Sequence, residues 1–402
     1  MNFKFGIDQL LASSELMDKL DRKRVGLVAH PASITSANLH SLDSLIYRHC
    51  NIVCAFGPQH GMRGDKQDNM NESEDYLDPL HQIPIVSLYG EHRIPTSEMI
   101  QNLDVILYDL QDIGCRIYTY ISTLKYFIEA CAKHGNELWV LDRPNPTGRP
   151  IDGLFLQPGE ESFVGCDELP TRHGLTVGEL AGWFNSRQEK PADLRIIDMH
   201  DYSPDAGPNF GWPIGQRPWI NPSPNAAGLN MARCFPGTVL LEGTTLSEGR
   251  GTTIPLEVIG SPDLPLEDVL SYMREAAPGW LEGAYLRPCF FEPTFHKYTG
   301  QMCHGLQIHT DYAGYDHASF KPFRLIAGML KSLRHCQPDY DLWRHHEYEY
   351  ETNRIPIDVI NGGPELRNWV DDSSLDFASL DSRLQEVENA WVDQRRPFLR
   401  YK

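Results

Sequence analysis

A short apolar run that ends in charged residues is the sequence feature that most constrains the fold. Residues 105–108 read Val-Ile-Leu-Tyr, and Asp109, Asp112 and Arg116 follow closely. A run this continuously apolar is typical of a strand buried on both faces, which in α/β proteins means a parallel sheet covered by helices. Ligands of such sheets bind beyond the carboxyl ends of the strands. We therefore expect these acids and this arginine at a site on that edge.

The same pattern recurs along the first half of the chain, where apolar segments alternate with amphipathic ones as in a βαβ series. Gly135 suits a helix C-cap, and Thr176 with Glu179 fits an N-terminal capping box. The predicted strands are 24–31, 51–56, 84–90, 104–110, 137–143 and 194–199, and the predicted helices are 36–49, 97–102, 118–134 and 176–187.

The second half of the chain has a different pattern. Residues 203–228 are rich in proline, glycine and asparagine, which indicates the approach to a domain boundary. Beyond them we predict helices at 266–277, 320–335 and 380–396 and strands near 284–291 and 304–310. Since 402 residues are long for one core, we predict an α/β protein with two domains. Residues 1–230 would form a Rossmann-like parallel-sheet domain, and residues 231–402 a smaller α+β domain.

Charge and composition narrow the range of partners. The net charge of −19 argues against nucleic acid and anionic membranes, because phosphate binding needs a surplus of Lys and Arg. No stretch is apolar and long enough to span a bilayer, and the first residues lack the features of a signal peptide. The nine cysteines lack zinc-site spacing, and neither GxGxxG nor GxxxxGK[ST] occurs. We expect a cytoplasmic protein with mostly reduced thiols, no metal and no cofactor.

Further candidate site residues follow two other predicted strands. Residues 57–64 contain three glycines, which let the backbone approach a ligand while side chains project into a cleft. An acidic loop, 65–78, comes next, and we expect one of its acids to be functional. The remaining candidates in these segments are His60, Arg63, Asp142, Arg143 and Asn145.

Three later segments add candidates. His173 directly precedes a predicted helix, where backbone N–H groups favour anions or polar ligands. Asn225 ends an Asn-Pro-Ser-Pro-Asn segment that suits hydrogen bonding to sugar hydroxyls or an acetamido group. Glu242, Glu248 and Arg250 lie in a glycine- and threonine-rich loop too polar for a core. Structural ion pairs and turns are the alternative for all these residues, and residues 345–347 are expected at the surface.

The chain contains a series of ordered motifs: PQHG-RG at 58–64, SLYG at 87–90, D-QD-G-R-YTYI at 109–121, LDRPNP at 141–146, SFVG at 162–165, P-RHG-T-GEL at 170–180, PSPN at 222–225 and GT-EGT-LSEGRGTT at 237–253. Their order resembles the exo-β-N-acetylmuramidase (NamZ) family, long known as a domain of unknown function. The resemblance runs from about Arg24 to the C-terminal end. It implies a Rossmann-like catalytic domain, a smaller domain that completes the cleft, and cofactor-free release of N-acetylmuramic acid from the non-reducing end of peptidoglycan fragments.

Two positions depart from the family pattern. The resemblance implies a catalytic glutamate where this chain has Gln59, and it implies an asparagine where the chain has Thr245. Because an amide cannot act as a general acid at neutral pH, we expect a nearby acid such as Glu72 to take over that role.

The expected chemistry is hydrolysis of a β-glycosidic bond through an oxocarbenium-like transition state, with two acids drawn from Glu72, Asp109, Asp112 and Glu248. One acid would protonate the leaving oxygen, and the other would activate water or attack the anomeric carbon. An arginine would pair with the lactyl carboxylate of muramic acid. The expected substrate is a muropeptide or a disaccharide that contains N-acetylmuramic acid. The predicted binding residues are His60, Arg63, Arg116, Tyr118, Asp142, Arg143, Asn145, His173, Asn225 and Arg250.

Two other functions stay open at this point. The first is a hydrolase or transferase that acts on another amino sugar, and the second is a non-catalytic muropeptide-binding protein. A nicotinamide-dependent glycosidase is disfavoured because the phosphate-binding glycines are missing.

Overall fold

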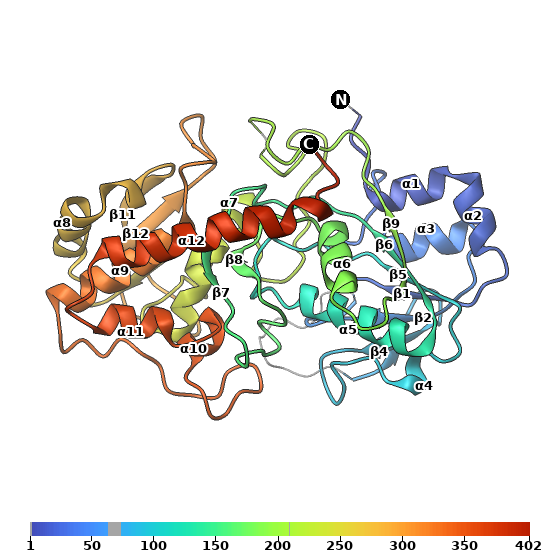
Figure 1. The fold of residues 1–402 in the computed structure, drawn as a ribbon, viewed down its shortest axis with the longest axis horizontal. Helices are drawn as coiled ribbons and strands as arrows, with labels where there is room; N and C mark the ends of the chain where they lie inside the picture. Colours follow the sequence, from blue (N-terminus) through green and yellow to red (C-terminus); the bar gives the residue numbers. More distant parts are fainter. Residues whose placement is uncertain (1, 63–73, 209) are drawn as a thin grey trace.

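The computed structural model describes residues 2–62, 74–208 and 210–402, and its largest sheet has seven strands in the order β3-β4-β2-β1-β5-β6-β9 (Figure 1). Neighbouring strands are parallel except at one edge, where β3 pairs antiparallel with β4. The predicted parallel sheet is therefore confirmed. The strands are β1 Val25–Val28, β2 Ile52–Gly57, β3 Tyr76–Leu77, β4 Pro84–Ser87, β5 Val105–Tyr108, β6 Glu137–Leu141 and β9 Asp193–Ile197.

Helices cover both faces of this sheet because the central strands are apolar on both sides. Alternate side chains of a strand point to opposite faces. In β5, Val105 and Leu107 pack into the core on one face, and Ile106 and Tyr108 pack into the core on the other. The first core includes residues of α1 Gly6–Ala12, α2 Ser14–Leu20 and α3 Ser41–Tyr47, and the second includes residues of α4 Ser97–Ile100, α5 Tyr120–His134 and α6 Val177–Ser186.

The helix boundaries follow local chemistry. Helix α5 ends at Gly135, whose φ of 81° is the left-handed conformation that glycine adopts at low cost. Helix α6 begins with the predicted capping box: the Thr176 hydroxyl accepts from the Glu179 N–H, and the Glu179 carboxylate accepts from the Thr176 N–H. Both predictions are confirmed. Helices α1 and α2 lie in a segment for which the sequence pattern predicted no helix.

The second half of the chain builds a smaller α+β region, as predicted. Its antiparallel sheet has the order β10-β12-β11 and is covered by helices. One hydrophobic core runs without a break from α5 and α6 into this region. The elements here are α7 Leu229–Thr238, η1 Val239–Gly243, β10 Val258–Ser261, α8 Leu266–Ala276, η2 Pro278–Leu281, β11 Tyr285–Phe291, β12 Cys303–His309, α9 Pro322–Cys336, α10 Pro356–Asn361 and α11 Glu365–Asp371; β7 Asp152–Phe155 and β8 Pro170–Arg172 form a separate hairpin.

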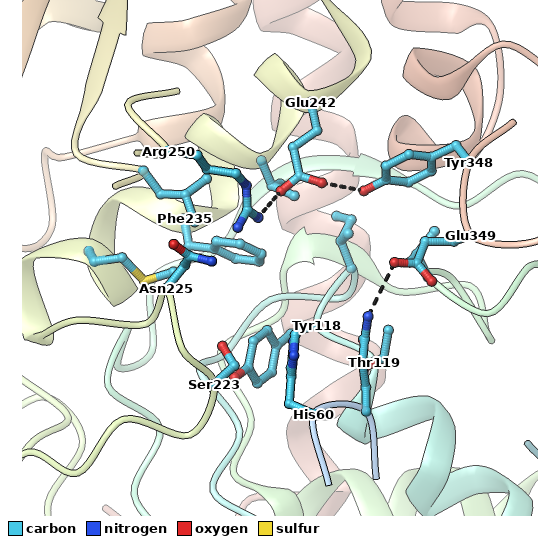
Figure 2. Close-up of a pocket in the computed structure, with 16 residues that line it drawn as sticks. His60, Tyr118, Thr119, Ser223, Asn225, Phe235, Glu242, Arg250, Tyr348 and Glu349 are labelled. Carbon is cyan, nitrogen blue, oxygen red and sulfur yellow. Dashed lines mark hydrogen bonds and ion pairs between the residues drawn. The ribbon is translucent and has the colours of Figure 1, made fainter. Parts of the chain in front are cut away.

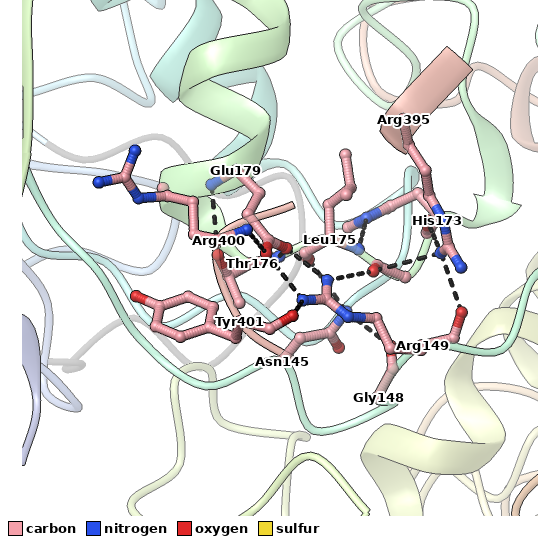
Figure 3. Close-up of polar contacts among 12 residues, drawn as sticks. Asn145, Gly148, Arg149, His173, Leu175, Thr176, Glu179, Arg395, Arg400 and Tyr401 are labelled. Carbon is pink, nitrogen blue, oxygen red and sulfur yellow. Dashed lines mark hydrogen bonds and ion pairs between the residues drawn. The ribbon is translucent and has the colours of Figure 1, made fainter. Parts of the chain in front are cut away.

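The C-terminal helix α12, Phe377–Arg395, crosses from the smaller region back to the large sheet (Figure 1). Its Trp391 indole donates a hydrogen bond to the His173 carbonyl at 2.7 Å, and Arg395 donates to the same carbonyl at 3.0 Å (Figure 3). The short helix η3, Arg396–Phe398, follows. Because α12 packs against both halves, the division at residue 230 stays a prediction.

Two general features complete the fold. Among the residues that the structure describes, no helix has the length and apolar character needed to cross a bilayer. All nine cysteines are free thiols, and six of them are buried.

Candidate active site

A pocket with about 500 Å³ of empty space opens beyond the carboxyl end of β2, on the edge where the sequence predicted a site. Both halves of the chain supply its walls, so the pocket forms only when the whole chain has folded. Figure 2 labels most of the polar lining, namely His60, Tyr118, Thr119, Ser223, Asn225, Glu242, Arg250, Tyr348 and Glu349. Gln59 also lines the pocket.

The turn after β2 carries Gln59 and His60 into the pocket. The Gly61 N–H donates to the Pro58 carbonyl at 2.9 Å, which closes the turn. His60 has a φ of 71°, a left-handed conformation that costs a non-glycine residue about 1–2 kcal/mol. Such strain persists where the surrounding structure holds a side chain in a functional position, and the His60 side chain faces the cavity in Figure 2.

The loop that carries Ser223 and Asn225 forms another wall, and three hydrogen bonds hold its backbone. The Tyr120 hydroxyl donates to the Pro222 carbonyl at 2.7 Å, and the Trp219 indole donates to the Ala226 carbonyl at 2.8 Å. The Ala226 N–H closes the turn on the Ser223 carbonyl at 3.0 Å. The Asn225 amide therefore meets a ligand from a fixed backbone.

Glu242 is one of two carboxylates in the pocket wall. Its Oε1 accepts a hydrogen bond from Arg250 Nη2 at 2.6 Å, and its Oε2 accepts one from the Tyr348 hydroxyl at 2.7 Å. A guanidinium on one oxygen and a phenol on the other form an environment that suits a carboxylate anion.

Glu349 is the second carboxylate. Its Oε1 accepts from the Gln59 amide at 3.3 Å, and its Oε2 accepts from the Tyr89 hydroxyl at 3.0 Å. Burial, together with the nearby Glu242 charge, raises the pKa of Glu349 to about 7. Two carboxylates with different environments around one pocket are what glycoside hydrolysis requires.

The predicted site residues divide between the pocket and other parts of the protein. Of those within the described ranges, His60, Tyr118, Asn225 and Arg250 line the pocket. Arg63 and Glu72 lie outside the described residues. The others, namely Asp109, Asp112, Arg116, Asp142, Arg143, Asn145, His173 and Glu248, are buried and are not among the residues that line it.

Asp109 and Arg143 form an ion pair inside the protein. Both Asp109 oxygens accept from the Arg143 guanidinium, at 2.8 and 2.9 Å, and the Ser41 hydroxyl also donates to this carboxylate. Burial raises the pKa of Asp109 in spite of this arginine. A buried charge needs a partner, and here Asp109 and Arg143 are each other's partner in the ion pair.

Backbone carbonyl groups accept hydrogen bonds from both terminal nitrogens of Arg116. Its guanidinium donates four hydrogen bonds of 2.6–3.1 Å to carbonyl oxygens, two from the β7–β8 segment and two from α10. These bonds join the first half of the chain to the second, and they use the donors that a ligand carboxylate would need.

Asp142 and Asn145 position the chain around the start of α6. Asp142 accepts from the Thr176 hydroxyl at 2.8 Å, the Gly178 N–H at 2.8 Å and the Tyr401 hydroxyl at 2.6 Å. The Asn145 amide donates to the carbonyls of Gly148 and Leu175 (Figure 3). These contacts give both residues a structural role.

Glu248 lies behind the pocket wall among cations. Lys297 donates to its Oε2 at 2.8 Å, and Arg250 Nε lies 3.3 Å from its Oε1. Burial alone would raise the pKa of Glu248, but Lys297, His296 and Arg250 hold it well below its usual range. Glu248 thus balances the charge of Arg250, which reaches the pocket.

Sequence reasoning missed Tyr348 and Glu349, because their segment is polar and resembles exposed tail. The signal that could have found them is the strict alternation of acids and tyrosines from Glu347 to Glu351, which is unusual for a solvated loop. Within the described ranges, no group of three or more His, Cys, Asp or Glu side chains is placed to hold a metal ion.

Comparison with known proteins decides the family. The N-terminal model of exo-beta-N-acetylmuramidase NamZ matches residues 25–230, and the C-terminal model matches residues 233–401. The chain belongs to the NamZ family. A relative from Bacillus subtilis (strain 168), the peptidoglycan beta-N-acetylmuramidase NamZ, is 37% identical over 340 residues, which are 83% of this chain and 78% of the relative.

Two solved structures of Bacteroides fragilis proteins from the DUF1343 family are similar over 100% of this chain and 99% of each of theirs. One has a TM-score of 0.85 with 28% identity, and the other a TM-score of 0.75 with 24% identity. The second shows a common fold only. The NamZ family that the sequence motifs predicted is thus confirmed.

Proposed function

We propose that this protein is an exo-acting β-N-acetylmuramidase that releases N-acetylmuramic acid from the non-reducing end of peptidoglycan fragments. The observation that carries the proposal is the match of both NamZ family models, to residues 25–230 and 233–401, which together include every residue that lines the pocket except Met231. The activity named for the Bacillus subtilis relative points the same way.

The pocket has the groups that this substrate needs. Asn225 and His60 offer hydrogen bonds to sugar hydroxyls and the acetamido group. Arg250 pairs with Glu242 and Glu248, but a guanidinium has five N–H donors, so it can still meet the lactyl carboxylate of muramic acid. That contact would select muramic acid over N-acetylglucosamine, which lacks the lactyl group.

The reaction that fits these groups is acid-assisted cleavage of the glycosidic bond. A carboxylic acid protonates the leaving oxygen while an oxocarbenium-like centre forms at the anomeric carbon. Glu242, which accepts hydrogen bonds from Arg250 and Tyr348 in the same pocket, would stabilise that centre, activate water or attack it. We do not assign these roles to the buried Asp109, Asp112 and Glu248.

The test is turnover of the 4-nitrophenyl β-glycosides of N-acetylmuramic acid and of N-acetylglucosamine by the purified protein. Nitrophenol release from the muramic compound alone is the expected result. Equal release from both would favour a hydrolase of another amino sugar. An Arg250→Lys variant should raise the KM for the muramic compound at least tenfold, because a point charge does not reproduce bidentate pairing.

A second candidate function is muropeptide binding without turnover. Gln59 favours it, because the family resemblance implies a glutamate at that position. Binding of the muramic glycoside in calorimetry, with no nitrophenol released over hours, would support this candidate and reject the first.

The form of the substrate and the compartment belong to the same proposal. We propose a muropeptide or a disaccharide containing N-acetylmuramic acid as substrate, and a cytoplasmic location. The nine free thiols suit a reducing compartment. Cell fractionation with an antibody against the protein would test the location.

A further inference from the structure

A second pocket adjoins the first, and Glu349 lies on the wall between them. The second pocket has about 1320 Å³ of space and is open to solvent. Among the residues that the structure describes, Glu349 is the one that lines both pockets. The aromatic residues Tyr126, Phe163 and Tyr350 line the second pocket, and Arg93 lies 3.7 Å over the Tyr350 ring.

The position of Glu349 is the position that a general acid must have. A glycosidic oxygen joins the sugar that is released to the remainder of the substrate, so its proton donor has to lie at the junction of the two binding sites. We infer that Glu349 protonates the leaving oxygen, in place of the glutamate missing at Gln59, and that the second pocket holds the leaving saccharide. This inference rests on the proposed function.

The backbone supports this assignment. The Tyr348 N–H donates to the Glu351 carbonyl at 3.1 Å, and the Glu351 N–H donates to the Tyr348 carbonyl at 2.9 Å. These two hydrogen bonds close a two-residue turn. Its central residues, Glu349 and Tyr350, have φ angles of 45° and 72°. Hairpin turns with two positive φ angles strongly favour asparagine and glycine. A glutamate and a tyrosine there cost stability, and such strained backbone positions cluster at functional sites.

The contacts of Gln59 indicate how Glu349 can take the role of an acid at position 59. Its Oε1 accepts a hydrogen bond from the Thr119 hydroxyl at 2.8 Å, which orients the amide so that its nitrogen faces Glu349. An acid at position 59 and an acid at position 349 would therefore reach nearly the same point in the pocket. The Gln59 amide occupies the place of the glutamate that the family resemblance implies. Because an amide does not titrate, the proton is carried by Glu349 instead.

The Glu349 carboxylic acid gives its proton to the glycosidic oxygen as the bond from that oxygen to the anomeric carbon breaks, and the leaving saccharide departs as an alcohol. Water supplies the hydroxyl group of the released muramic acid. The proton of that water returns to Glu349 directly, or passes through Glu242 and solvent.

The decisive experiment compares leaving groups. The substrates are the β-1,4-linked disaccharide of N-acetylmuramic acid and N-acetylglucosamine, and the 2,4-dinitrophenyl β-glycoside of N-acetylmuramic acid. Glu349→Gln should lower kcat/KM for the disaccharide about 10²- to 10⁴-fold, the usual contribution of a general acid. It should change the dinitrophenyl substrate less than tenfold, because that leaving group needs no proton. Glu347→Gln, an exposed neighbour in the same segment, is the control and should match the wild type.

A rescue variant separates chemistry from structure. Gln59→Glu combined with Glu349→Gln returns a carboxyl group to the other side of the same hydrogen bond, and it should recover at least tenfold of the lost disaccharide activity. Glu349→Asn, which suits the turn but gives up the hydrogen bonds from Tyr89 and Gln59, should still fold and should also lack this activity.

The pH profile gives a readout that a purely structural role would not change. Since the protonated Glu349 is the active form, kcat/KM of the wild type should fall as pH rises through about 7. Glu349→Gln should lack this descending limb. The charged or titratable groups that act on Glu349 are Tyr89, Glu242, Arg250 and Tyr348. His60 lines the first pocket with it, and Glu91, His92, Arg93, Lys125, Tyr126, Glu161, Tyr350 and Glu351 line the second.

The outcomes separate the two proposals. Wild-type cleavage of the disaccharide with full activity of Glu349→Gln would overturn the inference and leave the function intact, as would a loss confined to Glu72→Gln. A wild type that binds the disaccharide without cleaving it would overturn both.

An Arg93→Ala variant should raise KM for the disaccharide only, and an equal effect on both substrates would reject the second pocket as the leaving-group site.

Discussion

Asp112 and His173 show how burial controls charge at single residues. The two side chains are fully buried, and His173 Nε2 lies 3.9 Å from Asp112 Oδ2, beyond hydrogen-bond distance. Burial raises the pKa of Asp112 to about 7 and lowers that of His173 to about 3. Both groups are therefore mainly neutral near pH 6. Neither Asp112 Oδ1 nor His173 Nε2 has a hydrogen-bond partner among the described residues.

This arrangement predicts how stability depends on pH. The folded pKa of Asp112 lies above its unfolded value, so the folded state binds more protons and stability falls as pH rises from about 4 to about 7. Asp112→Asn removes that slope. In urea unfolding at pH 5 and pH 8, the stability difference between the two pH values should shrink by something on the order of 2–3 kcal/mol. Exposed Asp339→Asn serves as control, and an unchanged slope in Asp112→Asn would contradict the assignment.

At the scale of elements, six of the seven strands of the large sheet were predicted, and β1 and β5 were the clearest because each is a local run of buried apolar residues. The two-residue edge strand β3 has two exposed side chains and was not predicted. The α6 capping box was predictable because its two members are three residues apart. The pairing of Gln59 with Glu349 spans 290 positions, and no local pattern encodes it. Asp109 and Arg143 resembled site residues because they follow strand ends, but the sequence could not show that they neutralise each other.

The start of α6 gives the prediction at this scale. The Thr176 hydroxyl accepts from the Glu179 N–H and donates to buried Asp142, so Thr176→Val loses a cap and leaves a carboxylate short of a donor. We expect a loss of about 2–3 kcal/mol in the free energy of unfolding. Ser13→Ala removes only a cap, at α2, and should cost about 1 kcal/mol. Equal losses in urea unfolding would show that the contact with Asp142 contributes nothing.

For the whole molecule, the C-terminal tail closes a network that begins in the large sheet. Figure 3 shows Arg149, Glu179, Arg400 and Tyr401 around the start of α6. Arg149 donates to the Tyr401 carbonyl at 2.9 Å, and the Arg400 N–H donates to Glu179 at 2.8 Å. Arg116 joins the halves at a second place through the carbonyls of α10. The two walls of the pocket are thus fixed relative to each other from two sides.

The tail therefore contributes to global stability. Tyr401→Phe removes the hydroxyl that donates to Asp142 and accepts from the Met199 N–H, and it should lower the free energy of unfolding by about 1–3 kcal/mol. Tyr47→Phe is the matched control, since Tyr47 is 82% exposed and should stay within about 0.5 kcal/mol of the wild type. Identical urea midpoints for the two variants would refute a stabilising tail.

The bond between Tyr401 and Asp142 also has a consequence for biosynthesis. The ribosome makes the large sheet first. Asp142 is synthesised 259 residues before Tyr401, whose hydroxyl donates a hydrogen bond to it. Until then Asp142 and Glu179 lack partners that come only from the tail. The nascent large sheet is consequently less stable before Tyr401 is synthesised than after it, and the polar network of this sheet is completed only once translation has passed Tyr401.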